Sequence, residues 1–158
     1  MTRSLSPTLT TAVVAVCQLA LVGVAVAPQL SARVAGDSYV VRVAPLDPID
    51  PFRGAYVALD YPDLRLDAPD DGESGDAYLA LVEEDGVWVG DRWTRTRPAQ
   101  GPYLACDDRS WQVRCGIESW FLPQDRAREV EDQLRDGALA ELRIDSRGNA
   151  TVVDVRAP

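Results

Sequence analysis

The feature that most constrains this chain is an uncharged, apolar segment near its start. Residues 8–27 carry no charged side chain, and Gln18 is their one strongly polar member. As a helix at ~1.5 Å per residue, the segment spans about 30 Å, the thickness of the hydrocarbon core of a bilayer. A helix this long inside a globular domain usually carries a polar stripe, which this segment lacks. The sequence therefore predicts a transmembrane helix or a signal peptide.

The residues after this segment decide between a retained anchor and a cleaved signal. Arg3 gives the charged start of a signal peptide, and residues 25–27 (Ala-Val-Ala) have the small-x-small form of a cleavage site. However, Pro28 would follow that cut directly, and signal peptidases generally reject proline there. Cuts after Ala32 or Ala35 would leave an apolar stretch longer than most signal peptides use. We expect a retained anchor, with cleavage as the alternative.

The lengths on either side of the anchor set its orientation. Residues 1–7 form a short tail that is easily left in the cytoplasm, so the long C-terminal part would be exported. Residues 28–37 include Pro28, Ser31, Gly36 and Asp37, and this composition predicts a linker. Residues 38–158 then form one extracytoplasmic domain, large enough to bury a core of its own.

The basic and acidic residues exclude several functions. All sixteen basic residues are arginine, and the chain has no lysine or histidine. Arginine stays protonated and cannot act as a general base, whereas histidine is the commonest acid–base catalyst and zinc ligand, and lysine forms Schiff bases. Residues 37–158 carry 25 acidic and 14 basic side chains, a net charge of −11 that repels nucleic acid and anionic lipid headgroups. We expect no enzyme, no metal, no cofactor and no nucleic-acid partner.

Short strands dominate the predicted domain. Residues 38–44 are rich in β-branched residues, and residues 55–61 alternate so that Val57, Leu59 and Tyr61 share one face. Three hairpins are expected, and the Asp85-Gly86 turn of the first is the strongest signal in the chain. Their arms are residues 77–82 with 87–93, 102–106 with 111–116, and 139–145 with 150–155. Residues 124–136 read as an amphipathic helix. The fold class is mainly β, an antiparallel barrel- or sandwich-like domain with one amphipathic helix, plus one N-terminal transmembrane helix.

Two groups of residues could add a cross-link or an ion. Cys106 and Cys115 lie on the two arms of the second hairpin, so a disulfide is expected in an oxidising compartment. Without a histidine to activate a thiol, a structural bond is the better interpretation than a catalytic one. The acidic loop, residues 67–76, has carboxylates that could bind calcium, but their spacing does not match an EF-hand. We expect a solvated loop, and the sequence leaves calcium binding open.

Two stretches resemble one family. Residues 50–61 (Asp-Pro-Phe-Arg-Gly-Ala-Tyr-Val-Ala-Leu-Asp-Tyr) are similar to the signature of the bacterial GDYXXLXY proteins. Residues 115–123 (Cys-Gly-Ile-Glu-Ser-Trp-Phe-Leu-Pro) resemble the later block of that family. The anchor, the two motifs and the hairpins come in the family's order, so the resemblance covers nearly the whole chain. Ala55 stands where the family has aspartate, and Cys115 replaces the usual aromatic residue.

The resemblance implies a set of motif residues and a role. The residues that it marks for structure or interaction are Arg53, Gly54, Tyr56, Leu59, Tyr61, Gly116, Glu118 and Trp120. We expect residues 54–61 to form a central, buried strand, and Arg53 to pair with a carboxylate, Glu118 being the candidate.

The resemblance implies a single-pass protein of the bacterial cell membrane that is an accessory to a multi-span membrane protein. An envelope module that binds glycan or peptide through Tyr56, Tyr61, Trp111 and Trp120 is the alternative, and a hydrolase using only carboxylates is a third.

Overall fold

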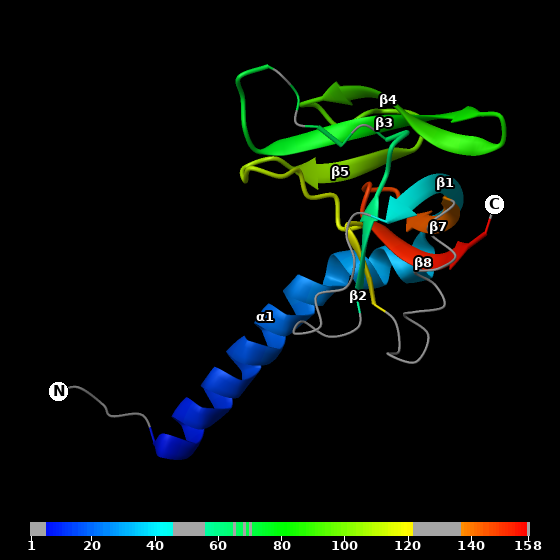
Figure 1. Ribbon diagram of the computed structural model, residues 1–158. Helices are drawn as coiled ribbons and strands as arrows, with labels where there is room; N and C mark the ends of the chain where they lie inside the picture. Colours follow the sequence, from blue (N-terminus) through cyan, green and yellow to red (C-terminus); the bar gives the residue numbers. More distant parts are fainter. Residues whose placement is uncertain are drawn as a thin grey trace.

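One long helix and two antiparallel sheets make up the computed structural model, which describes residues 6–45, 56–64, 66–67, 69, 71–121 and 137–157. Figure 1 shows helix α1 (Pro7–Ala35) rising at a slant to meet the β domain. The strands within the described residues are β1 (Asp37–Pro45), β2 (Tyr56–Asp60), β3 (Asp76–Glu84), β4 (Val87–Thr94), β5 (Tyr103–Asp107), β6 (Ser119–Phe121), β7 (Ala138–Ile144) and β8 (Ala150–Arg156).

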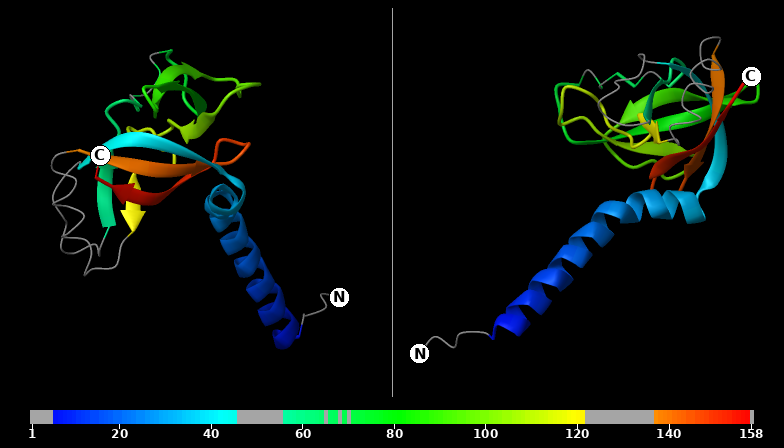
Figure 2. Two further views of the ribbon diagram at one scale, coloured as in Figure 1. Left: turned by 90° about the vertical axis from the view of Figure 1, so that its right-hand side faces the viewer. Right: turned by 60° about the horizontal axis from the view of Figure 1, so that its bottom comes forward.

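The strands form a curled half-barrel. One sheet has the order β6-β2-β1-β7-β8, and a smaller one has the order β4-β3-β5. Strand β1 connects the two halves of the larger sheet, because its residues 37–43 pair with β7 and only Ala44 and Pro45 pair with β2. Figure 2 shows the curl that results, with the smaller sheet lying over the larger one. This architecture confirms the predicted fold class.

Apolar side chains from alternate strand positions fill the space between the sheets. Val41, Val43 and Leu142 come from the larger sheet, and Leu79 and Leu104 from the smaller one; each is almost fully buried. Burying one such side chain contributes about 1.5–3 kcal/mol. Period-two alternation of buried side chains, clearest on β3 and β7, is therefore what assembles the domain.

Two of the three predicted hairpins are confirmed. In the β3–β4 hairpin, Asp85 and Gly86 have φ values of 51° and 81°, as a tight hairpin turn requires. The β7–β8 hairpin turns through residues 145–149, where Gly148 has φ of 81°. A Cβ atom at Gly148 would lie 2.7 Å from a ring carbon of Tyr103, so this turn needs glycine for space as well as for φ.

The second predicted hairpin forms only in part. Residues 111–116 are not a strand, and Arg114 makes one isolated antiparallel bridge to Asp107. The strand lies further along the chain, at β6, which pairs with β2. The predicted helix at residues 124–136 and the motif residues Arg53 and Gly54 lie outside the described residues.

The predicted linker is the largest difference between expectation and structure. Residues 28–35 continue α1, and β1 begins at Asp37, so no flexible connection separates helix and domain. Pro28 lacks the N–H that would bond Val24, and a proline inside a helix bends it, as Figure 2 shows for α1. The part beyond Pro28 stays helical because it packs on β7 and β8.

Helix α1 is long and apolar enough to cross a membrane. Its apolar part, Thr8–Ala35, has a mean hydropathy of 2.3 and is the single candidate span in the described part of the chain. Its large side chains are exposed, including Leu19, Leu21 and Val24. Such a helix fits a membrane anchor or a signal sequence.

Candidate functional site

The end of α1 is packed tightly into the domain. Ala32 is fully buried, and the backbone of Gly36 lies so close to β7 that a Cβ atom there would be 2.8 Å from the backbone nitrogen of Ile144. The Arg143 guanidinium donates a hydrogen bond of 2.8 Å to the Gly36 carbonyl. Glycine at position 36 is therefore required by space, and the helix cannot pivot freely at this point.

Polar side chains of the last helical turns also bind the domain. Gln29 Nε2 donates to the Gly116 carbonyl at 3.2 Å, and Ser31 Oγ donates to Asp145 Oδ2 at 2.5 Å. Arg147 Nη2 in turn donates to Ser31 Oγ at 3.1 Å. We call this set of contacts, together with Ala32 and Gly36, the anchor junction.

Asp145 is the centre of the anchor junction. It is buried, and its carboxylate also accepts hydrogen bonds from the Arg147 N–H at 2.8 Å and from Asn149 Nδ2 at 2.8 Å. Burial alone would raise the pKa of Asp145, but the hydrogen bonds from Ser31 and the β7–β8 turn outweigh it and lower that pKa. The Asp145 carboxylate thus both stabilises the β7–β8 turn and binds the end of α1. Ser31 and Asp145 lie 114 residues apart, so no local pattern reveals their contact.

The two family-like stretches meet beside the anchor junction. Strand β2 pairs with β6, the Leu59 N–H donates to the Glu118 carbonyl at 3.1 Å, and Tyr61 Oη donates to the Ile117 carbonyl at 2.6 Å. Tyr61 is only 3% exposed and Leu59 4%. Burial raises the pKa of Tyr61, and the nearby charge of Glu118 adds to the effect. We call this set, Leu59, Tyr61 and residues 116–118, the motif contact. Its tyrosine is part of the buried core.

Glu118 shapes the backbone of the second stretch. Its carboxylate accepts from the N–H groups of Cys115 and Gly116, the second at 3.0 Å. Gly116 has φ of 83°, and a Cβ atom there would lie 3.1 Å from Gln29 Nε2, so this residue also lets the helix approach. The predicted pair of Glu118 with Arg53 involves a residue outside the described part and stays a prediction.

A cleft opens between α1 and the motif contact. Its volume is about 610 Å³, and its walls include Gln29 and Arg33 of the helix, Gly116, and Ser119 and Trp120 of β6. Trp120 is half-buried and packs against the core. We call this cleft the junction cleft. The junction cleft brings together three of the predicted motif residues, Gly116, Glu118 and Trp120. Leu59 and Tyr61 lie in the core instead. The side chain of Tyr56 lies outside the described part of the structure.

The disulfide joins the second stretch to the smaller sheet. Cys106 of β5 and Cys115 are bonded, with their Cα atoms 4.1 Å apart. Both are buried, so the bond lies within the core. The predicted pairing is confirmed, and it fits an oxidising compartment outside the cytoplasm. Cys17 is a free, exposed residue of α1.

Arginines bind two carboxylates of the acidic loop, Asp71 and Asp76, although both side chains stay exposed to solvent. Arg95 binds both oxygens of Asp71 at 2.8 Å and Asp108 at 2.7 Å, and it also donates to the Glu73 carbonyl. The hydrogen bonds from Arg95 lower the pKa of Asp71 to about 2. This part of the loop is therefore held against the smaller sheet by a guanidinium, which sequence reasoning missed.

Two carboxylates converge near β3 and β5 without forming an acid–base pair. Asp76 and Asp107 are opposite each other in the β3–β5 register, and Arg109 binds them at 2.9 and 2.6 Å. The pKa of Asp107 is lowered, mainly by the hydrogen bond from the backbone N–H of Arg109 and further by the Arg109 side chain. Burial raises the same pKa, but the hydrogen bonds outweigh it. A general acid needs a raised pKa, so Asp107 is unsuited to that task.

Comparison with known proteins gives one match. The family model described as "GDYXXLXY protein" matches residues 18–155, which is nearly the whole chain. No curated protein matches. No solved structure matches.

Proposed function

The chain belongs to the GDYXXLXY protein family, and from the anchor junction we propose that it is a membrane-anchored accessory protein without enzymatic activity. In this proposal α1 is retained as a single-pass anchor, its N-terminus is cytoplasmic, and the β domain is extracytoplasmic in the bacterial envelope. Its partner is a multi-span membrane protein. The observation that carries the proposal is the direct continuation of the apolar helix into the packed anchor junction.

The anchor junction favours retention over cleavage. A cut after Ala32 or Ala35 would remove Gln29 and Ser31, and with them the hydrogen bonds to the Gly116 carbonyl and the Asp145 carboxylate. A typical intramolecular hydrogen bond contributes about 0.5–1.5 kcal/mol to stability, and one to a charged group about 1.5–3 kcal/mol. The disulfide supports an oxidising location for the domain.

The same rigidity supports a partner in the membrane. A domain that only needs tethering can hang from a flexible linker, whereas a fixed junction holds the domain in one orientation above its helix. The junction cleft then always faces the same direction relative to α1, so a neighbouring membrane protein meets a constant surface. We propose Arg33, Ser119 and Trp120 as the contact residues on this surface.

The competing functions are less well supported. Of the four aromatic residues of the alternative glycan- or peptide-binding module, Tyr61 is buried with its hydroxyl bonded to the backbone, Trp120 is half-buried and Trp111 is exposed, so these three do not form one exposed aromatic surface. Asp76 and Asp107 line the same cleft, and both are bound by Arg109. A hydrolase acting in this cleft would need one of them as a proton donor.

Site-specific photo-crosslinking in intact cells tests the proposal. A photoreactive residue at Ser119 should give a crosslink to one multi-span membrane protein, identified by mass spectrometry. The same residue at Asp154, an exposed position of β8, is the matched control and should give none. N-terminal sequencing should show a mature chain beginning at or near Met1. A chain beginning at Pro28 or later, or no crosslink from Ser119 and Arg33, would contradict the proposal.

A further inference from the structure

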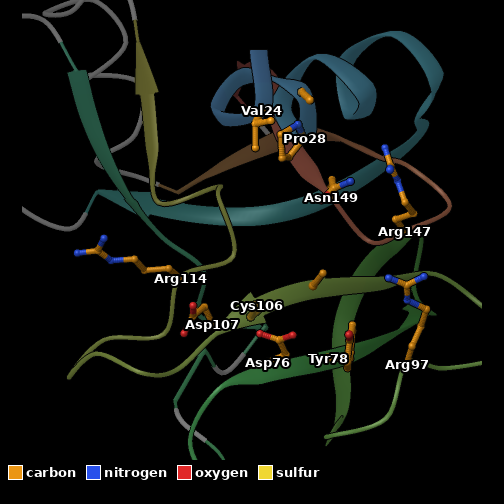
Figure 3. A pocket seen from close by; sticks show the side chains of 12 residues that line it. Val24, Pro28, Asp76, Tyr78, Arg97, Cys106, Asp107, Arg114, Arg147 and Asn149 are labelled. Atoms are coloured by element: carbon orange, nitrogen blue, oxygen red, sulfur yellow. The ribbon is translucent and has the colours of Figure 1, made fainter. Parts of the chain in front are cut away.

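A second and larger cleft lies on the other side of α1, facing the smaller sheet. Its volume is about 690 Å³, and Figure 3 shows Val24 and Pro28 of the helix projecting toward Cys106 and Asp76 across it. Three arginines from separate loops, Arg97, Arg114 and Arg147, line its ends. One wall is thus an apolar helix, and the rim is cationic.

The charge of this cleft is opposite to that of the domain around it. Residues 37–158 have a net charge of −11, yet the lining contains three arginines and two aspartates. Both aspartates are already bound by Arg109, which reaches them from outside the lining. Within the described part of the chain, Arg97 and Arg114 form no ion pair. Their guanidinium groups are therefore available to an anion.

The position of the cleft along α1 points to a lipid. Val24 and Ala27 belong to the end of the uncharged segment, where a helix leaves the hydrocarbon core and enters the headgroup layer. Trp111 lies between Arg109 and Arg114 in the same loop and is 89% exposed. Tryptophan is enriched at this depth of a membrane, because its ring is apolar and its N–H is polar.

We propose that this cleft binds the headgroup of an anionic phospholipid from the leaflet in which α1 ends. Arg97 and Arg114 lie at opposite ends of the cleft (Figure 3), and each binds phosphate oxygens at its own end, since guanidinium groups match phosphate geometry. The first part of an acyl chain lies along Val24 and Ala27, and Trp111 enters the headgroup layer. The inference rests on the retained anchor of the proposed function, and it does not require the partner.

Lipid retention by the full-length protein tests this inference. The protein is placed in nanodiscs of phosphatidylcholine with a minor share of phosphatidylglycerol, released gently, and analysed by native mass spectrometry. Wild type should keep phosphatidylglycerol above its share in the disc. Arg97→Gln with Arg114→Gln should reduce this enrichment about tenfold or more, because two phosphate contacts are lost. The control, Arg92→Gln with Arg156→Gln, removes the same charge from exposed positions elsewhere and should keep the enrichment.

Each result has a defined meaning. Equal loss in the control would show general charge attraction and overturn the site, as would unchanged enrichment in the cleft variant. Displacement of the lipid by inorganic phosphate would show a soluble-anion site and overturn the lipid assignment. Failure of wild type to remain with membranes would overturn the retained anchor and this inference together, whereas membrane retention without lipid enrichment would overturn the inference alone.

Discussion

Removing one oxygen atom from Tyr61 tests whether the family motif stabilises the core of the domain. In Tyr61→Phe the ring stays and no cavity forms, but the Ile117 carbonyl loses the hydroxyl that donates to it at 2.6 Å. A net hydrogen bond contributes about 0.5–1.5 kcal/mol, and a buried carbonyl left without a partner costs about 1–3 kcal/mol. Because Tyr61 is 3% exposed, water cannot easily replace the hydroxyl. We expect the free energy of unfolding to fall by about 2 kcal/mol.

Urea unfolding of the full-length protein in detergent micelles, followed by tryptophan fluorescence, measures this change. The midpoint should fall while the slope with urea stays constant, since the surface exposed on unfolding is unchanged. The matched control is Tyr39→Phe. The Tyr39 ring packs edge-on against Trp88 at a centroid distance of 5.0 Å, and its hydroxyl makes no hydrogen bond within the described residues. The control should change the unfolding free energy by less than about 0.5 kcal/mol.

Two outcomes would refute the reasoning. If Tyr61→Phe is as stable as Tyr39→Phe, the hydroxyl does not hold the motif contact together. If Tyr61→Phe is fully stable but abolishes the crosslink from Ser119, the Tyr61 hydroxyl acts at the interface with the partner.

Two further predictions concern the disulfide and the acidic loop. Cys106→Ser with Cys115→Ser should lower the unfolding free energy by ~2–3 kcal/mol on the chain-entropy model for a separation of nine residues, whereas Cys17→Ser should leave it unchanged; a thiol count of one in the oxidised protein checks the pairing independently. The folded-state pKa of Asp71 is about 2, below its unfolded value of 3.8, so its stabilising contribution is full above pH 4 and is lost as the pH falls toward 2. Thermal unfolding between pH 6 and 2 should show this loss, Asp71→Asn should reduce it, and a flat wild-type profile would contradict the Arg95 contact.

Local patterns predicted the parts of the fold that local chemistry determines. The Asp85-Gly86 turn sets two consecutive positive φ values, and that requirement is visible in two letters of sequence. The alternation that placed Leu59 and Tyr61 on one face also correctly placed both in the core. The disulfide could be inferred because its two cysteines lie close in the chain.

The anchor junction could not be predicted because its contacts are distant in sequence. Pro28, Ser31 and Gly36 suggest a linker when read alone, and proline inside a helix is unfavourable. The helix continues because Ala32 is buried and Ser31 donates a hydrogen bond to Asp145, which lies in a turn more than a hundred residues away. Strand β6 was missed for a related reason, since three residues are too few to show a period and the strand exists through its pairing with β2.

The location of the motif residues limits where a partner can bind. Leu59 and Tyr61 are buried, and the Tyr61 hydroxyl and the Leu59 N–H are used by the backbone of residues 117–118. Their role is to fix that backbone, whose neighbour Gly116 accepts a hydrogen bond from Gln29 of α1. A chain of direct contacts therefore runs from the core strand β2 through the second motif to the end of the anchor. A partner that shifts α1 would change this series of contacts indirectly. The partner itself could touch only the exposed residues that lie beside the series. For this reason we expect substitutions at the exposed Ser119 to weaken partner binding without unfolding the domain, and substitutions at Tyr61 to act through stability.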